Sequence, residues 1–495
     1  MSTIIVRENG KKRVFDHDGS GDLLAFLGAH GYVLNAPCGG NGTCGKCRVT
    51  LRCGGETKTV LACRTPADRD CEILLGPEAA DLSWNDASAA VSAEGGRKGL
   101  GAAVDLGTTT VAVSLFDLSD GRCLGTLSEW NAQKNRGADV ITRIGWCMEH
   151  PDGLEQLGTA VRTQILSMVK TLAEKNGAAL RGVKEIFLAG NTVMQHIFAG
   201  IAPDSIAAAP YLPQSYFDDP RPFLLDGIPV FLAPCMAGYV GGDISAGILD
   251  TGLARGKKRT LFIDVGTNGE MAIGNRDGIL CTSTAAGPAF EGGNISCGMG
   301  SVPGAICSVT IEEEKASIQT IGNDAPCGLC GTGVIETTAE LVRTELVDET
   351  GRLEEPYFEE GFPLSSDPNG NPILFTQKDV REIQLAKAAV RAGLETLLLR
   401  AGISYRDVGA VYLAGGFGYR IDKDKAATIG MLPEELLEKT SAIGNSSLAG
   451  ASAVLCEEAK LLHAVEIAKS AKEIPLSTDK DFNRLYMESM YFGEE

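Results

Sequence analysis

Residues 102–115 read AAVDLGTTTVAVSL, and residues 261–274 repeat the same pattern as LFIDVGTNGEMAIG. Each stretch is an apolar run that ends in Asp-x-Gly-Thr and is followed by a second apolar run. Apolar runs of this length bounded by a glycine turn are typical of two strands joined by a tight connection. A single such turn occurs by chance, but two in matched contexts indicate an internal duplication.

The chain that follows each turn is also duplicated. The first copy continues with a helical stretch at 154–176 and the strand EIFLAGNTV at 185–193. The second continues with a helical stretch at 383–401 and the strand AVYLAGGFG at 410–418. Two matching units of this kind predict two similar α/β lobes.

The repeated turns carry the residue types that bind phosphate. Gly107 and Gly266 can adopt backbone angles closed to other residues, which lets a phosphate approach the main chain. Backbone N–H groups and polar side chains there form an anion-binding concavity. Asp105 and Asp264 are placed to hold a hydrated Mg²⁺ or to orient the attacking water, and are the candidate catalytic residues. The candidate nucleotide-binding residues are Gly107, Thr108, Thr109, Thr110, Gly266, Thr267, Asn268 and Gly269.

A different site is predicted near the N-terminus. The glycine-rich loop APCGGNGTCGKC contains Cys38, Cys44 and Cys47, and Cys63 follows after fifteen intervening residues. Three thiolates from one loop and a fourth from a later segment bind the [2Fe–2S] cluster of plant-type ferredoxins, and the five-residue first gap matches the adrenodoxin-like variant. A zinc site and unrelated reduced cysteines are the alternatives. Zinc ribbons use two short cysteine pairs, and this N-terminal segment contains only one, Cys44 and Cys47. The spacing therefore favours the iron–sulfur cluster.

The segments around this loop predict a small mixed fold. Asn9-Gly10 is a hairpin dipeptide between two strand-like stretches. The expected elements are strands at 2–7, 12–15, 48–52 and 58–62 and a helix at 23–32. This ββαββ order around a metal loop resembles the β-grasp ferredoxin fold and covers residues 1–78.

Length and composition set the remaining bounds. A chain of 495 residues is too long to fold around a single hydrophobic core. The expected parts are a ferredoxin domain (1–78), an Ala/Ser/Gly-rich linker (79–99), a first lobe (100–258) and a second lobe (259–495). The net charge of −19 argues against nucleic acid and against an anionic membrane surface. No run of 18 apolar residues and no N-terminal signal pattern occurs. Fifteen scattered cysteines fit a reducing compartment, so a cytoplasmic location is expected.

The duplicated units resemble the actin, sugar-kinase and Hsp70 ATPase superfamily, which has a ribonuclease H-like fold. In that resemblance DLGTTT (105–110) and DVGTNGE (264–270) are the two phosphate loops, which implies ATP as the nucleotide. LAGGFG (413–418) matches the adenosine-binding turn, which implies that Gly415, Gly416 and Gly418 pass close to the nucleoside. GNSSLAGA (444–451) corresponds to a further glycine-containing helix start near the nucleotide.

A ferredoxin module joined to this ATPase fold resembles the reductive activators of corrinoid proteins. The segments similar to that family are NAQKNRGADVITRI (131–144), LAGNTVMQHIF (188–198), YVGGDISAG (239–247), AAGPAFEGG (285–293) and CGTGVIE (330–336). Longer members carry an additional domain between the ferredoxin and ATPase parts, whereas here about twenty linker residues intervene.

The resemblance implies an ATP-hydrolysing iron–sulfur enzyme. Its task would be to pass one electron to the Co(II) form of the corrinoid protein of a methyltransferase system, with ATP supplying the driving force. It further implies an upstream electron donor and suggests a homodimer. Two other functions stay open: an ATP-driven electron donor to a non-corrinoid enzyme, and a redox-sensing protein whose nucleotide site only switches conformation.

Five further residues have an ordinary structural explanation beside a functional one. Asp243 and Glu270 are candidate metal-proximal carboxylates, and helix capping explains Asp243 equally well. Cys327 and Cys330 form a lone C-x2-C pair that is expected to be a plain loop. His196 is expected to be a core or helix-face histidine.

Overall fold

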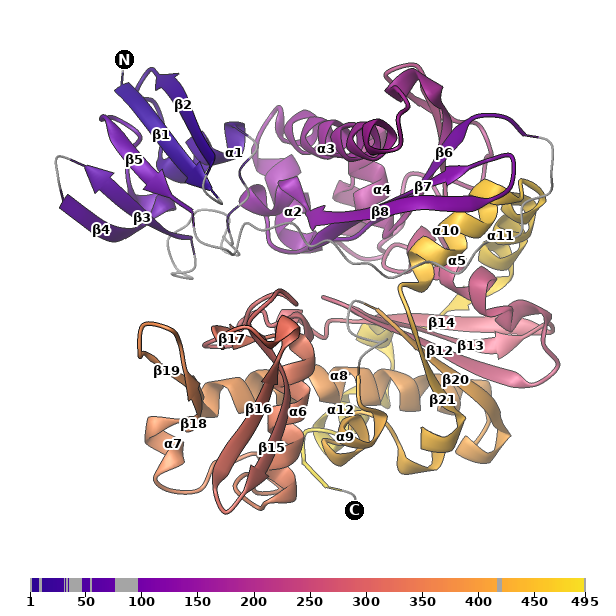
Figure 1. Cartoon of the computed structure of the whole chain (residues 1–495). Coiled ribbons are helices and arrows are strands. Elements are labelled where there is room, and N and C mark those ends of the chain that lie inside the picture. Colours follow the sequence, from indigo (N-terminus) through magenta and orange to yellow (C-terminus); the bar gives the residue numbers. More distant parts are fainter. Residues whose placement is uncertain are drawn as a thin grey trace. The chain divides into compact units, whose positions relative to one another are not determined.

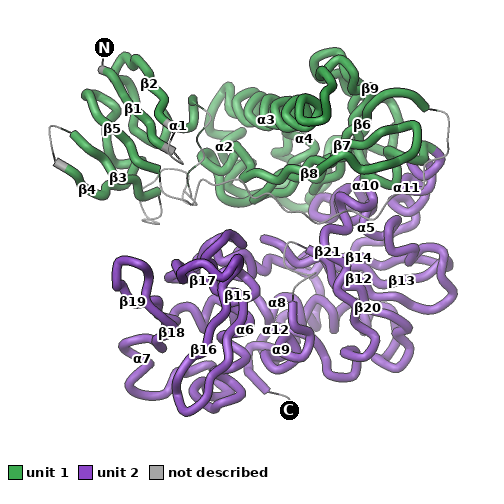
Figure 2. Tube along the Cα trace, viewed as in Figure 1, with its two compact units in different colours: residues 1–233, 451–458 green, residues 234–450, 459–495 purple. Residues whose placement is uncertain are grey.

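The structure is a computed structural model (Figure 1). It describes residues 2–8, 11–30, 32, 34, 47–53, 56–75, 97–415 and 421–493. The chain forms two compact units, coloured separately in Figure 2: unit 1 is residues 1–233 with 451–458, and unit 2 is residues 234–450 with 459–495.

The N-terminal part of unit 1 is a five-stranded mixed sheet in the order β2-β1-β5-β3-β4. Its elements are β1 (Ser2–Glu8), β2 (Lys11–His17), α1 (Leu23–Ala29), β3 (Arg48–Cys53), β4 (Glu56–Leu61) and β5 (Cys71–Leu74). The four expected strands and the helix are present. The helix begins at Leu23 as expected, where Asp22 caps it, but it ends at Ala29 rather than at residue 32.

The central strand β5 was not expected from the sequence. It is four residues long and lies between β1, to which it is parallel, and β3, to which it is antiparallel. Ile73 of β5 is fully buried and packs with Leu27 of α1 and Ile4 of β1 in one core. A central position in the sheet therefore gives this short segment its strand structure.

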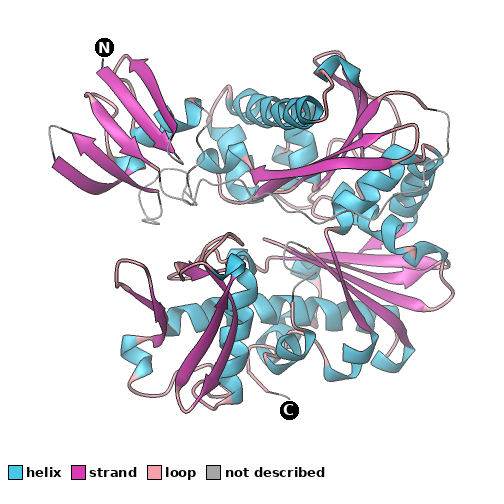
Figure 3. Ribbon diagram, viewed as in Figure 1, coloured by secondary structure: helices cyan, strands magenta, loops and turns pink. Residues whose placement is uncertain are grey.

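The rest of unit 1 is built on a six-stranded sheet in the order β10-β11-β9-β6-β7-β8. Its strands are β6 (Leu100–Leu106), β7 (Thr110–Asp117), β8 (Arg122–Trp130), β9 (Val183–Gly190), β10 (Phe223–Leu225) and β11 (Ile228–Leu232), and its helices are α2 (Val140–Glu149), α3 (Gly153–Lys175) and α4 (Thr192–Ala199). Helix α3 packs on β7 and β8 (Figure 3). Leu157, Val161 and Ile165 of α3 are fully buried, as expected for a helix with one apolar face.

Unit 2 contains a second six-stranded sheet, in the order β21-β20-β12-β13-β14-β22. Its strands are β12 (Arg259–Val265), β13 (Gly269–Asn275), β14 (Gly278–Thr284), β20 (Val408–Ala414), β21 (Thr440–Gly444) and β22 (Ala471–Glu473). Helix α8 (Gln377–Ala401) packs on β13 and β14. The Thr376–Asp379 capping box fixes where this helix begins.

The two sheets have the same internal order, so the duplication predicted from the sequence is confirmed. In each, an antiparallel β-meander begins with the strand that carries the Asp-x-Gly-Thr turn, β6 or β12. In each, a later strand, β9 or β20, pairs in parallel with that first strand. The long helix expected between the meander and the parallel strand is present in both, as α3 and α8.

A subdomain inserted between β14 and α8 was not expected from the sequence. It contains a three-stranded sheet, β16-β15-β17, and a separate two-stranded sheet, β18-β19. Its elements are β15 (Ala305–Glu312), β16 (Lys315–Thr320), β17 (Gly328–Leu329), α6 (Gly331–Arg343), α7 (Tyr357–Glu360), β18 (Phe362–Ser366) and β19 (Pro372–Phe375). Helix α6 packs on β15 and is the main helix of this subdomain.

The remaining helices are α5 (Gly242–Thr251), α9 (Lys423–Thr428), α10 (Ser446–Cys456), α11 (Ala459–Ser470) and α12 (Phe482–Glu488). Helix α10 begins where the GNSSLAGA segment predicts a helix start. Among the helices of the described residues, none has both the length and the apolar composition needed to cross a membrane.

Candidate functional site

Two of the four predicted cluster ligands lie next to each other. Cys47 directly precedes β3, and Cys63 lies in the 3-10 helix Ala62–Arg64 that follows β4. Their Sγ atoms are 3.2 Å apart and both side chains are buried. That separation is longer than the about 2.05 Å of a disulfide bond, so the two sulfur atoms lie side by side without being joined in a disulfide. Cys38 and Cys44 lie outside the described residues.

The other two cysteines of this domain behave differently. Cys53 donates its thiol to the carbonyl oxygen of Asp70 at 3.3 Å. Burial, with a further contribution from Cys53, raises the pKa of the Cys71 thiol to about 11. A thiol with so high a pKa stays protonated at neutral pH and is a poor metal ligand. Both therefore have the properties of ordinary structural thiols.

The first predicted phosphate turn connects β6 to β7. Asp105 is the penultimate residue of β6 and pairs with Ala112 of β7 and Ala189 of β9. Gly107 does not have a positive φ angle, so the backbone explanation expected for this glycine is wrong. The reason is steric instead, because a Cβ atom at Gly107 would lie 2.7 Å from the carbonyl oxygen of Thr110.

The second turn connects β12 to β13 in the same way. The N–H of Gly266 donates to the carbonyl oxygen of Asn268 at 2.9 Å, which closes the turn. Gly266 also has no positive φ angle, and among the described residues an added Cβ atom would meet only Glu291 Oε1, at 3.7 Å. Within that part of the chain, neither backbone strain nor packing explains the glycine at position 266. The hydroxyl of Thr267 donates to Glu291 Oε2 at 2.8 Å.

Three carboxylates influence one another beside this second turn. Asp264 and Glu270 are directly opposite on β12 and β13, and Asp243 comes from the first turn of α5. Burial, then Asp243, then Asp264 raise the pKa of the Glu270 carboxyl well above its ordinary value. Asn268 partly offsets this by donating to Glu270 Oε1 at 3.1 Å. In the part of the chain that the structure describes, no three His, Cys, Asp or Glu side chains are grouped closely enough to hold a metal ion.

The predicted adenosine-binding turn begins beside the second phosphate turn. Gly415 follows β20, has a φ of +114°, and would place an added Cβ atom 2.2 Å from the carbonyl oxygen of Val265. Only glycine fits there. Its N–H donates to the carbonyl oxygen of Gly444 at 3.2 Å. The end of β12, the start of this turn and the end of β21 thus meet within unit 2, whereas Gly416 and Gly418 lie outside the described residues.

Comparison with known proteins gives the family. A family model described as the RACo middle region matches residues 100–256, and one described as the C-terminal domain of RACo, the ASKHA domain, matches residues 258–495. The corrinoid activation enzyme RamQ of Eubacterium limosum is 30% identical, with 96% of each chain covered. This chain belongs to the family of reductive activators of corrinoid proteins.

Two further relatives agree with this family. A [Co(II) methylated amine-specific corrinoid protein] reductase of Methanosarcina barkeri is 28% identical over 78% of this chain and 76% of its own length. The solved structure of a reductive activator for a corrinoid, iron–sulfur protein matches with a TM-score of 0.75 and 29% identity, covering 99% of this chain and 98% of its own. The expected multidomain fold with an actin- and sugar-kinase-like ATPase part is thereby confirmed. The alignment with RamQ spans 576 positions, more than the 495 residues here, so part of that relative has no counterpart in this family member.

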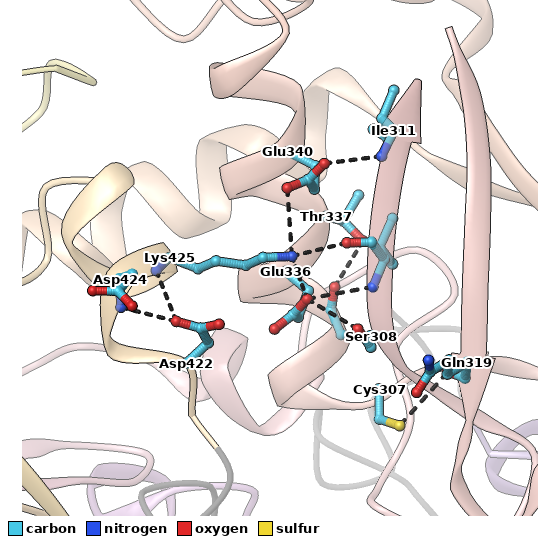
Figure 4. Close-up of polar contacts among 12 residues, drawn as sticks. Cys307, Ser308, Ile311, Gln319, Glu336, Thr337, Glu340, Asp422, Asp424 and Lys425 are labelled. Atoms are coloured by element: carbon cyan, nitrogen blue, oxygen red, sulfur yellow. Dashed lines mark hydrogen bonds and ion pairs between the residues drawn. The ribbon is translucent and has the colours of Figure 1, made fainter. Parts of the chain in front are cut away.

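A buried ion-pair network joins helix α9, which follows the adenosine-type turn, to the inserted subdomain (Figure 4). Lys425 of α9 forms ion pairs with Glu336 at 2.5 Å and Glu340 at 3.5 Å, both on α6. Its ammonium group also donates to the carbonyl oxygen of Val309 on β15 at 2.9 Å. The two carboxylates are 7–8% exposed, and their burial requires positive charge. Lys425 supplies it to Glu336, and it shares Glu340 with Arg343, which pairs with that carboxylate at 2.7 Å.

The groups that hold the first turn were not identified from the sequence. Asn131, Arg143 and Asn191 donate side-chain hydrogen bonds to residues 107 and 108. Glu291 and Lys425 were missed in the same way. Asn131, Arg143, Asn191 and Glu291 lie in segments quoted for the family resemblance. Their hydrogen bonds join residues far apart in the chain, and such bonds leave no periodic pattern in a sequence.

His196, Cys330 and Cys327 each contact neighbouring groups of the protein. His196 is fully buried, bonds to the carbonyl oxygen of Thr192 at 2.7 Å, and accepts from the N–H of Ser215 at 3.2 Å. Burial raises the pKa of the Cys330 thiol, which donates to the carbonyl oxygen of Ile306. Cys327 is exposed, with its Sγ atom 3.8 Å from the Met299 sulfur.

Proposed function

We propose that this chain is an ATP-dependent reductive activator that transfers one electron to a Co(II) corrinoid protein and restores the Co(I) state used in methyl transfer. Its membership of the family supports the corrinoid partner. The observation that carries the proposal is the pairing of two buried thiols, Cys47 and Cys63, in the chain that also holds the duplicated Asp-x-Gly-Thr turns.

Cys38, Cys44, Cys47 and Cys63 would hold a [2Fe–2S] cluster. The two described members fit this role, because they come from separate segments, are buried, and place their sulfur atoms 3.2 Å apart. A cluster of this type supplies one electron at a low reduction potential, which is about −400 mV in plant-type ferredoxins. Both cysteines lie next to strands of the sheet: Cys47 directly precedes β3, and Cys63 follows the end of β4.

Both turns would bind the phosphates of ATP, with Asp105 and Asp264 holding Mg²⁺ or orienting water. Among the described residues, only Glu291 Oε1 comes within 4 Å of where a Cβ atom at Gly266 would lie, at 3.7 Å, which supports an approach by a bound group. Thr267 is kept in one orientation by its bond to Glu291. Asp243, Asp264 and Glu270 together form a negative region whose charge a divalent cation would offset. Gly415, Gly416 and Gly418 would lie along the nucleoside.

ATP is required for an energetic reason. A tenfold change in a one-electron equilibrium corresponds to about 59 mV, so reduction against a gap of a few hundred millivolts does not proceed to a useful extent without a driving force. Nucleotide binding and hydrolysis by the two turns would provide it. The proposal also includes an upstream electron donor, a homodimer and a cytoplasmic location.

The proposal is tested by mixing the reduced protein, under anaerobic conditions, with a Co(II) corrinoid protein and following the absorption of Co(I) with and without ATP. ATP-dependent formation of Co(I) supports it. Reduction of a different low-potential enzyme, without any reaction at cobalt, would instead favour a non-corrinoid electron acceptor. ATP binding without electron transfer to either acceptor would favour a nucleotide switch.

A further inference from the structure

The first turn is fixed through its backbone carbonyl groups. The side-chain N–H of Asn131 donates to the carbonyl oxygen of Gly107 at 2.8 Å, and its backbone N–H donates to the carbonyl oxygen of Thr109 at 2.9 Å. Arg143 Nη2 donates to the carbonyl oxygen between them, that of Thr108, at 2.5 Å. Three consecutive carbonyl groups are therefore held by residues that follow β8.

These bonds also orient the N–H groups of the turn. The peptide bonds of this segment are trans, and a planar trans peptide points its N–H opposite to its carbonyl oxygen. Because the Thr108 carbonyl faces Arg143, the N–H of Thr109 points away from Arg143. The N–H groups that follow the carbonyls of Gly107 and Thr109 likewise point away from Asn131, which holds those two carbonyls. A run of N–H groups with this orientation is what an anion-binding turn presents to a phosphate.

Arg143 is a fully buried cation. Its other donors reach the carbonyl oxygen of Gly137 at 3.1 Å, Gln133 Oε1 at 3.0 Å and Met194 Sδ at 2.9 Å. All of these acceptors are neutral. Burial lowers the pKa of Arg143 to about 9, and Asp139 raises it only in part, so the side chain is charged at neutral pH. The Asp139 carboxylate is itself engaged as the cap of α2, bonded to the N–H of Thr142 at 2.8 Å.

We propose that Arg143 is a positioning residue of the phosphate turn, and that its buried positive charge strengthens the binding of nucleotide phosphates. The proposal rests on the proposed function, since it assumes that the turn binds ATP. The guanidinium aligns the Thr108 peptide and adds positive potential behind it. Charge buried among neutral groups acts over a longer range than charge in water, because the surrounding dielectric constant is low. A structural role alone would need the hydrogen bonds but not the charge.

Gln133→Glu separates these two roles. The substitution keeps the shape of the side chain and gives Arg143 a carboxylate partner at a position where it already bonds. The guanidinium and its bond to Thr108 remain, but the net charge behind the turn is cancelled. Arg143→Met removes both charge and bonds, whereas Arg143→Lys keeps the charge and loses most of the bonds.

The measurement is the dissociation constant of the purified holoprotein for ATP and for AMP, together with the denaturation temperature. We expect Gln133→Glu and Arg143→Met to reduce the preference for ATP over AMP about tenfold to a hundredfold, and Arg143→Lys to recover part of it. Arg162→Met is the matched control, because Arg162 also donates to a backbone carbonyl, that of Phe198, in the same unit. It should leave the preference unchanged.

Each outcome decides between the alternatives. An unchanged ATP preference in a folded Gln133→Glu protein, with a loss in Arg143→Met, means that Arg143 acts through its hydrogen bonds and overturns the role of its charge. Unchanged preference in both variants overturns the whole inference. A wild-type protein that binds neither ATP nor AMP contradicts the proposed function instead, and is recognised before any variant is compared. If Arg143→Met does not fold, Gln133→Glu and Arg143→Lys still decide the question.

Discussion

Asp264 and Glu270 lie directly opposite each other on the neighbouring strands β12 and β13. Two carboxylates at such positions repel each other, and the pKa of Glu270 is raised by burial and by this charge. Asp264 therefore weakens the fold locally, and the proposed function gives a reason for its presence: Mg²⁺ or the attacking water requires a carboxylate there.

Asp264→Asn should change stability and ATP hydrolysis in opposite directions. Removing one of two facing charges should raise the free energy of unfolding by roughly 0.2–1 kcal/mol. ATP hydrolysis should fall by about a hundredfold, because a carboxylate that holds the metal or the water is lost. Asp277→Asn, at the exposed turn between β13 and β14, is the control and should change neither quantity. Unchanged hydrolysis in Asp264→Asn would remove this residue from the catalytic assignment.

Cys47→Ser should abolish the cluster and leave nucleotide binding intact. Cys47 is one of the two thiols placed side by side, so its loss removes a cluster ligand. The visible absorption and the electron paramagnetic resonance signal of the reduced protein report the cluster, and calorimetric titration reports ATP binding. Cys53→Ser is the control, since its thiol bonds to a backbone carbonyl. A full cluster spectrum in Cys47→Ser would contradict the ligand assignment.

Lys425→Met should destabilise unit 2. The change leaves the buried Glu336 carboxylate without its Lys425 partner, whereas Glu340 keeps its ion pair with Arg343 at 2.7 Å. Breaking an ion pair costs about 3–5 kcal/mol when it is fully buried. The Lys425 side chain is 20% exposed, so we expect the lower end of that range. The urea midpoint of unfolding measures the loss. Lys423→Met, on the same helix but bonded to a backbone carbonyl, is the control and should have a smaller effect.

A double variant tests the cause. Glu336→Gln combined with Lys425→Met removes the carboxylate charge that has lost its Lys425 partner and should recover part of the stability. If the double variant is no more stable than Lys425→Met, the loss comes from packing rather than from an unpaired charge.

Lys387 should make stability depend on pH. Its ammonium group is buried in α8, donates to the carbonyl oxygen of Tyr491, and lies 5.0 Å from the centre of the Phe492 ring. Burial, with a smaller effect of Arg391, lowers its pKa from 10.5 to about 7. Between these values the unfolded chain binds more protons than the folded one, so stability rises as the pH increases from 7 towards 10.5. The slope from this group approaches about 1.4 kcal/mol per pH unit in the middle of the window.

Lys387→Met should remove that contribution. We expect its denaturation temperature to change less than that of the wild type between pH 7 and 9.5. Lys378→Met, which replaces an exposed lysine on the same helix, should keep the wild-type profile. Identical profiles for the wild type and Lys387→Met would show that Lys387 is charged in the folded protein over this range.

The elements predicted best from the sequence are those with a repeated or periodic signal. Such signals occur in the two Asp-x-Gly-Thr turns and in the long helices α3 and α8. The structure contains all four elements, with one turn and one helix belonging to each of the two matching sheets. Strand β5 has only four residues, and its strand structure depends on β1 and β3 on either side. No local pattern could reveal it.

The candidate site follows the same rule. Glycine and aspartate in the turns are recognisable because their spacing is local. Arg143 reaches the carbonyl of Thr108 across 35 positions of sequence, and Lys425 reaches Glu336 across 89. Such contacts depend on how strands and helices pack, so they became visible only in the structure. The positive φ angle expected at Gly107 and Gly266 was also wrong. Lack of space explains Gly107, whereas among the described residues neither cause applies to Gly266, and sequence alone does not separate these cases.

The most direct test of the central claim is the rate of Co(I) formation in a Co(II) corrinoid protein, measured anaerobically for the wild type, Cys47→Ser and Asp264→Asn. The account predicts rapid, ATP-dependent formation for the wild type, none for Cys47→Ser, and strongly reduced formation for Asp264→Asn. Formation of Co(I) by the wild type at the same rate and to the same extent without ATP, or undiminished formation by Cys47→Ser, would contradict it.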